Sequence, residues 1–165
     1  MLRPYQVQGF QWLSTVWDKG FGGILADEMG LGKSVQLLSL IEARKGRGPA
    51  LIVCPASLVY NWAAECEKFA GDLTVEVVAG TKAQRRKAIA SVSSRSKKGH
   101  DDTDSGTPYD GADVVITSYD LLRRDVDDYG ACHFAMMALD EAQYIKNHAT
   151  KLAKAVKRVP ADHRF

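Results

Sequence analysis

Short apolar runs recur along the chain, and polar stretches with helical spacing separate them. Five of these runs are aliphatic or β-branched, which predicts strands at 22–26, Ala50–Cys54, 74–79, 113–117 and Phe134–Leu139. The runs are continuously apolar and do not alternate with polar residues. We therefore expect the strands to be covered on both faces.

Amphipathic segments lie between the runs and predict helices at 4–19, 33–45, 57–69, 82–92, 119–124 and 150–158. Ser57 and Thr81 stand where a helix N-cap is expected. Strands that alternate with helices predict an α/β fold, with a mostly parallel sheet and helices on both faces. In such folds ligands bind beyond the carboxyl ends of the strands.

One segment, at about 93–110, differs from the rest. It contains no aliphatic residue, and its charge changes from basic in the first half to acidic in the second. Such a segment buries too little apolar surface to offset the entropy of ordering, so we expect a mobile surface loop there.

The composition is that of one ordinary globular domain. Of the 165 residues, 45% are hydrophobic and 25% are charged, and the net charge is +2. No apolar run approaches the length of a membrane span, so we expect no membrane partner. The three cysteines are scattered, which argues against a disulfide framework or a zinc site and favours a reducing compartment.

The strongest chemical signal is the run GGILADEMGLGKS at 22–34, in which a predicted strand leads through a loop into a helix. Successive backbone N–H groups in such a loop bind a polyphosphate, and Gly30 and Gly32 allow the backbone to approach it. Lys33 supplies a positive charge for the β and γ phosphates, and the Ser34 hydroxyl is placed to bind Mg²⁺.

A pair of acids follows the predicted strand Phe134–Leu139. Asp140 at the strand end is placed to hold Mg²⁺, and Glu141 to orient and deprotonate an attacking water. On its own, such a pair is more commonly two solvated acids; the phosphate loop favours the chemical interpretation.

The runs LRPYQVQGFQWL, GGILADEMGLGKS, LIVCPASLVYNW, VVITSYDLL and LDEAQYIKN together resemble the Swi/Snf-type DNA-dependent ATPases of helicase superfamily two. Their order and spacing are similar to the N-terminal RecA-like lobe of that two-lobed motor, over almost all of residues 1–165. The strict phosphate-loop pattern has glycine where Asp27 stands, but Asp27 agrees with the loop of this family.

The resemblance implies roles for individual residues. Gln6 corresponds to the glutamine that reads adenine, Lys33 and Glu141 to catalytic residues, and Ser34 and Asp140 to the ligands of Mg²⁺. The residues implied in ATP binding are Arg3, Gln6, Asp27, Met29, Gly30, Leu31, Gly32, Lys33 and Ser34.

Two positions depart from the usual family pattern. Ser34 replaces the more frequent threonine and keeps the hydroxyl, and Gln143 stands where many relatives have histidine. Both replacements can donate hydrogen bonds, so we expect altered coupling with the chemistry intact. The glutamine form resembles prokaryotic members.

The resemblance also implies contacts with double-stranded DNA after the strand ends, at Ser57, Asn61, Gly80, Lys82, Thr117 and Ser118. Lys82, Arg85, Arg86 and Lys87 form either a basic patch for phosphates or an ordinary solvated helix face. Trp62 is expected to pack in the core or a groove.

The family motor has a second RecA-like lobe that supplies arginine fingers, and a strand with the third helicase motif is expected directly after Phe165. We therefore expect residues 1–165 alone to turn over ATP barely or not at all. A motor of this kind would act in the nucleoid of a prokaryotic cytoplasm or in a eukaryotic nucleus. A non-catalytic module that binds DNA or a partner stays open as an alternative; a P-loop kinase or GTPase is disfavoured by the absence of an NKxD segment.

Overall fold

A parallel sheet of five strands runs through the part of the chain that the structure describes. The computed structural model describes residues 33–43, 48–100, 112–140 and 151–164, with isolated helical positions at Pro4, Gln8, Gln11 and Thr15. The predicted helix 4–19, apart from those positions, and the predicted strand 22–26 lie outside the described residues, as does the loop 27–32.

The strands are β1 (Ala50–Cys54), β2 (Val75–Val77), β3 (Val114–Ser118), β4 (Phe134–Leu139) and β5 (Ala161–Arg164). They lie in the order β2-β3-β1-β4-β5, and every neighbouring pair is parallel. Four of them fall on predicted runs, with ends shifted by two residues at most. The α/β fold with a mostly parallel sheet is therefore confirmed.

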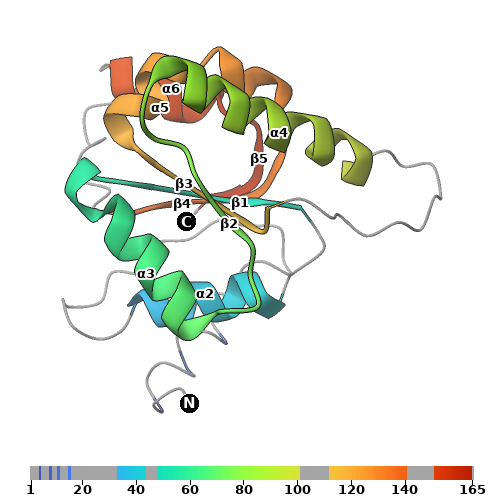
Figure 1. Ribbon diagram of the computed structural model, residues 1–165. Helices are drawn as coiled ribbons and strands as arrows, with labels where there is room; N and C mark the ends of the chain where they lie inside the picture. The colour runs from blue at the N-terminus through green and yellow to red at the C-terminus, as the bar shows by residue number, and fades with distance from the viewer. Residues whose placement is uncertain are drawn as a thin grey trace.

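Helices cover both faces of this sheet (Figure 1). The helices are α2 (Lys33–Ala43), α3 (Val59–Phe69), α4 (Lys82–His100), α5 (Tyr119–Asp125) and α6 (Lys151–Arg158). Helices α2 and α3 lie on one face, and α4, α5 and α6 lie on the other. Two short 3₁₀ turns, Ala56–Leu58 and Asp128–Ala131, complete the connections.

Two apolar clusters hold the layers together, one on each face of the sheet. Ile52 and Cys54 of β1 point into the cluster shared with α2 and α3, whereas Leu51 and Val53 point into the cluster shared with α4 to α6. All five residues of β1 are buried, as expected of a central strand covered on both faces.

Three boundaries differ from prediction. Ser57 does not cap α3: it lies exposed in the 3₁₀ turn, and Leu58 precedes the helix without a side-chain cap. Helix α4 continues to His100, so the loop expected from residue 93 is wrong for 93–100. The last strand begins at Ala161, whereas we expected the next strand only after Phe165.

The N-terminus of α4 is capped as predicted. The Thr81 hydroxyl accepts a hydrogen bond of 3.3 Å from the backbone N–H of Gln84, and the Gln84 side chain accepts one of 2.9 Å from the backbone N–H of Thr81. This reciprocal pair is a capping box. In the described part of the chain, no helix combines the length and apolar character that crossing a membrane requires.

Candidate functional site

The carboxyl ends of the three central strands meet at one edge of the sheet. In the register of β1 with its neighbours, Cys54 lies opposite Ser118 of β3, and Val53 lies opposite Leu139 of β4. The segments that follow these strands therefore begin side by side. Asp140, the predicted metal ligand, is the first residue after β4.

Asp140 is held by residues from three other elements. Its backbone N–H donates to the carbonyl of Val53 at 2.8 Å, and its backbone carbonyl accepts from the Tyr119 hydroxyl at 2.7 Å. Its side-chain Oδ2 accepts from the indole Nε1–H of Trp62 at 2.9 Å. Backbone and carboxylate are thus both fixed by the surrounding fold.

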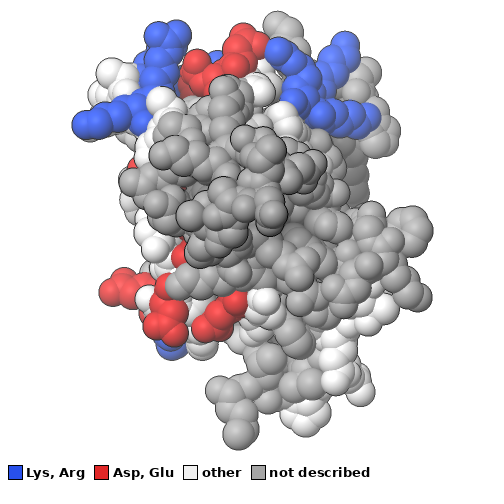
Figure 2. All heavy atoms as spheres, turned by 90° about the vertical axis from the view of Figure 1, so that its right-hand side faces the viewer, with Lys and Arg blue, Asp and Glu red and all other residues white. Residues whose placement is uncertain are grey.

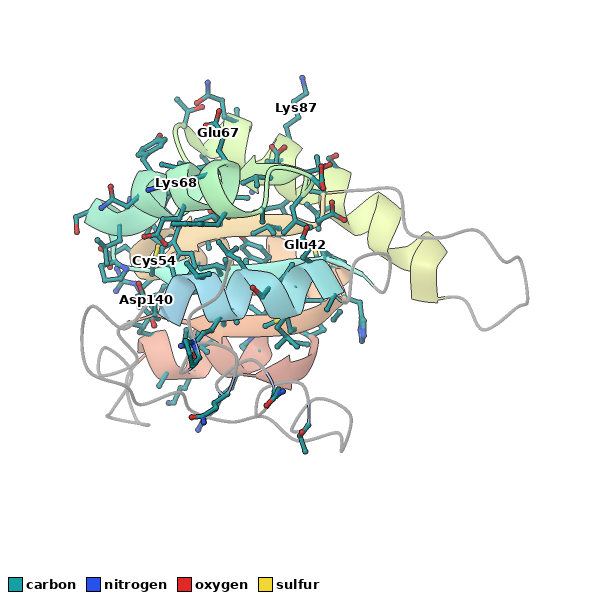
Figure 3. All side chains as sticks on the ribbon, turned by 90° about the horizontal axis from the view of Figure 1, so that it is seen from below. Glu42, Cys54, Glu67, Lys68, Lys87 and Asp140 are labelled. Atoms are coloured by element: carbon teal, nitrogen blue, oxygen red, sulfur yellow. The ribbon has the colours of Figure 1, made fainter. Side chains whose placement is uncertain are left out.

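The start of α2 lies on the same side of the molecule as Asp140. In Figure 3, Asp140 and Cys54 lie at one end of the sheet, and Glu42, next to the last residue of α2, lies toward the other. Figure 1 agrees, because the N-terminal end of α2 is on the side where β4 ends. A helix N-terminus and a carboxylate at one sheet edge are the arrangement in which a metal-bound phosphate can bind.

The donor chemistry at this edge fits a magnesium ion. Mg²⁺ takes oxygen ligands. Among the described residues, Trp62 donates to Oδ2 of Asp140, which leaves Oδ1 to bind a metal ion. Lys33 and Ser34 open α2, although only their backbone is described. Arg3, Gln6, the loop 27–32 and Glu141 lie outside the described residues, so their roles stay predictions.

Cys54, at the end of β1, is chemically quiet despite its position. Its side chain is fully buried, and its Sγ–H donates to the carbonyl of Thr117, with Sγ and the oxygen 3.8 Å apart. Burial, with a smaller contribution from the negative charge of Asp140, raises the pKa of the Cys54 thiol from 9.0 to about 12. The thiol is therefore protonated at neutral pH and does not act as a nucleophile.

The residues predicted to contact DNA fall into two groups. Ser57, Asn61, Gly80 and Lys82 are exposed, as phosphate contacts require. Thr117 and Ser118 are buried.

Both buried hydroxyls have internal partners. The Thr117 hydroxyl donates to the carbonyl of Val78 at 3.1 Å, and Ser118 Oγ accepts from the backbone N–H of Leu121 at 3.3 Å, which caps α5. Both hydroxyls thus form hydrogen bonds inside the fold, and the DNA contact expected at Thr117 and Ser118 stays a prediction. The first bond joins the end of β3 to the residue after β2, and the second stabilises the start of α5.

The prediction that the basic residues of α4 share one exposed surface is wrong for Arg85. Arg85 is buried and forms two hydrogen bonds to the carboxylate of Asp125, at 2.7 and 3.1 Å, so it adds no exposed charge. Arg86 is exposed and lies 3.7 Å from Asp128. Lys82 and Lys87 keep exposed side chains.

The net charge of +2 hides an uneven distribution (Figure 2). On the face shown, Lys and Arg gather mainly on the side of α4 to α6, and Asp and Glu predominate on the side of α2 and α3. Among described residues, the helical layer of α4 to α6 carries exposed basic side chains at Lys82, Arg86, Lys87, Arg123, Arg124, Lys154, Lys157 and Arg158. Attraction of a polyanion by the described part of the chain would act mainly through this layer.

Sequence reasoning missed the two aromatic residues that hold Asp140. Trp62 was expected in the core or a groove, and it is buried as expected, but its hydrogen bond to a carboxylate 78 residues away has no local signal. Tyr119 was predicted only as the start of a short helix. The sequence shows that Trp62 and Tyr119 directly follow the predicted DNA contacts Asn61 and Ser118. It does not show that both form hydrogen bonds to Asp140.

Residues 5–165 match the family described as SNF2-related domain. The chain is 36% identical to the lymphoid-specific helicase of Homo sapiens, covering all of this chain and 19% of that protein. It is 34% identical to the TATA-binding protein-associated factor mot1 of Schizosaccharomyces pombe, covering 99% of this chain and 8% of that protein.

Among solved structures, the chain is similar to the Sulfolobus solfataricus SWI2/SNF2 ATPase core in complex with dsDNA. The TM-score is 0.75 and the sequence identity 34%, over 99% of this chain and 31% of that one. The chain therefore spans about a third or less of the proteins it matches here. The fold expected from the sequence agrees with that of this ATPase core.

Proposed function

Because the chain belongs to the family of SNF2-related domains, we propose that it is the ATP-binding lobe of a DNA-stimulated ATPase. The longer protein would translocate along duplex DNA and remodel protein–DNA complexes. The observation that supports this most directly is Asp140, fixed at the sheet edge on the side where α2 begins. This is where a phosphate-binding loop and a metal-binding carboxylate must meet.

The proposed chemistry divides among a few residues of this chain. Backbone N–H groups of 27–32 and the Lys33 ammonium bind the phosphates, and Gln6 selects adenine. Ser34 and Asp140 would hold Mg²⁺, which would neutralise negative charge on the phosphates. Glu141 orients the attacking water and accepts its proton.

DNA would be bound mainly through its phosphates, with little preference for sequence. The exposed residues Ser57, Asn61, Gly80 and Lys82 follow β1 and β2 and are available for such contacts. The solved structure similar to this chain is named as a complex with dsDNA, which supports duplex DNA as the partner. A protein of this kind would be found with the DNA, in a nucleoid or a nucleus.

We further propose that a second RecA-like lobe completes the motor. The chain spans 31% of the similar ATPase core. Residues 1–165 by themselves are therefore expected to bind nucleotide weakly and to hydrolyse it barely or not at all, since the arginine fingers of a second lobe contribute about 10³- to 10⁵-fold in rate.

The test uses a protein that contains these residues within a complete ATPase core. We expect duplex DNA to stimulate ATP turnover, and we expect Glu141→Gln to abolish turnover while ATP binding persists. Unchanged turnover in Glu141→Gln would remove Glu141 from its role. Salt-sensitive DNA binding without any affinity for nucleotide would favour the non-catalytic binding module instead.

A further inference from the structure

Two aromatic residues from different helices converge on Asp140. Trp62 of α3 contacts its carboxylate and Tyr119 of α5 its backbone carbonyl. We propose that Trp62 and Tyr119 are positioning residues that couple DNA contact to the orientation of the metal-binding carboxylate. This inference rests on the proposed function and adds a physical link between DNA binding and ATP hydrolysis.

The contact from Trp62 fixes the carboxylate without adding charge. An indole N–H donates and accepts nothing, so it orients Oδ2 while the full negative charge of Asp140 remains for a cation. The Trp62 side chain is itself buried, which limits the ways in which it can move independently of α3. The orientation of the carboxylate therefore depends on where α3 lies.

The contact from Tyr119 fixes the backbone of the same residue. Its hydroxyl donates to the Asp140 carbonyl at 2.7 Å, and its ring is buried in the cluster on the α4–α6 side. Tyr119 directly follows Ser118, whose Oγ caps α5. A shift of the end of β3 or the start of α5 would therefore move the hydroxyl that holds Asp140.

The turn of α3 that carries Trp62 also faces solvent on its other side. Asn61, proposed to contact DNA, is exposed, and the neighbouring Tyr60 is 70% exposed. Adjacent residues in one helical turn move together, since backbone hydrogen bonds fix their relative positions. Phosphate bound at the exposed side would thus bias the position of the indole on the buried side.

The test introduces Trp62→Phe and Tyr119→Phe separately into a protein with the complete ATPase core. Each change removes one hydrogen-bond donor and keeps an aromatic ring. The matched control is Tyr129→Phe. Tyr129 is a buried tyrosine in the same apolar cluster as Tyr119, and no contact between Tyr129 and Asp140 is among those described.

We expect both variants to fold and to bind duplex DNA as the parent does. The Mg²⁺ concentration needed for half-maximal binding of a non-hydrolysable ATP analogue should rise by about 10- to 100-fold, as for other residues that orient a metal ligand. DNA stimulation of turnover should fall by a similar factor. Adding duplex DNA without nucleotide should also change the parent's tryptophan emission, and Trp62→Phe should remove that change.

The outcomes separate the two proposals. A parent protein that DNA does not stimulate overturns the proposed function and the coupling with it. A stimulated parent whose Trp62→Phe and Tyr119→Phe variants match Tyr129→Phe in Mg²⁺ requirement and stimulation overturns the coupling alone. If Trp62→Phe fails to fold, Tyr119→Phe decides the question by the same two measurements.

Discussion

The guanidinium of Arg85 and the carboxylate of Asp125 face each other in a buried bidentate pair, with Nε–Oδ2 and Nη2–Oδ1 distances of 2.7 and 3.1 Å. The third contact of Arg85 runs from Nη1 to the carbonyl of Gly80 at 2.9 Å. The hydrogen bonds to Asp125 raise the pKa of Arg85 above its ordinary value. One side chain thus ties the end of α5 to the loop that precedes α4.

Removing one member of this pair should strongly destabilise the fold. Asp125→Ala leaves a buried guanidinium without its counter-charge, which typically costs about 3–5 kcal/mol. We expect the free energy of unfolding, measured by urea titration, to fall by that order. The double variant Arg85→Met with Asp125→Leu should be less destabilised than Asp125→Ala, because it removes both charges together.

Arg86 provides the control on the same helix. It is mostly exposed and lies 3.7 Å from Asp128, so Arg86→Ala should change the unfolding free energy by less than about 1 kcal/mol. Equal losses in Asp125→Ala and Arg86→Ala would show that the buried pair contributes no more than a surface pair.

Gly80 occupies a backbone conformation that other residues avoid. Its φ is +91°, and a Cβ there would collide with the side-chain amide oxygen of Gln84, which caps α4. Gly80→Ala should therefore destabilise the protein by about 1–2 kcal/mol in urea titration. Gly130→Ala is the matched change, since no atom from another part of the described fold lies within 4 Å of the position a Cβ would take, and it should be close to neutral. Similar values for both variants would refute the strain at Gly80.

The buried thiols predict a loss of stability at alkaline pH. Burial raises the pKa of Cys54 to about 12 and that of Cys66 to about 11, from 9.0. Above pH 9 the unfolded chain releases these protons and the folded chain retains them, so the free energy of unfolding falls as pH rises. Between the pKa of a thiol in the unfolded chain and its pKa in the folded chain, the free energy of unfolding falls by about 1.4 kcal/mol per pH unit for each thiol.

Cys54→Ala should remove one thiol's share of this slope. Urea titrations of parent and variant between about pH 8 and about pH 10.5 should therefore converge as pH rises. Curves that stay parallel over that range would show that the Cys54 thiol ionises alike in the folded and unfolded chain.

Lys82 is expected to contact DNA individually, whereas Lys87 is predicted only as one of the basic residues of α4 that form either a phosphate patch or a solvated helix face. Both are exposed on α4, and Lys87 lies well apart from Asp140 (Figure 3). In a protein with the complete ATPase core, Lys82→Ala should weaken duplex binding. The plot of log association constant against log salt concentration should become less steep, its slope smaller in magnitude by about one. Lys87→Ala should leave the slope near that of the parent. Identical slopes for Lys82→Ala and parent would exclude this phosphate contact.

Much of the sheet could be predicted because its strands carry their own signal. The run Phe134–Leu139 is continuously apolar and forms β4 with those bounds. Strand β5 carries no such signal, since Ala161–Arg164 contains three polar residues. Its conformation comes from backbone pairing with β4, which no local pattern reveals.

The errors at Arg85 and in α4 have different physical causes. A basic residue in a basic segment suggested an exposed patch, but its partner Asp125 lies 40 residues further along the chain. Residues 93–100 lack aliphatic side chains, yet extending an existing helix costs far less than starting one, because each added residue gains a backbone hydrogen bond.

The parallel order of the sheet has a consequence for synthesis of the protein. Asp140 contacts Trp62 from 78 residues further along the chain, and the pairing of β4 with β1 brings the end of β4 to this position. Contacts over such separations form late, because long loops must close first. A nascent chain that has emerged only through α4 already carries the segment proposed to bind phosphate but not Asp140. Under the proposed function, a metal-bound nucleotide would therefore be bound only after β4 has left the ribosome.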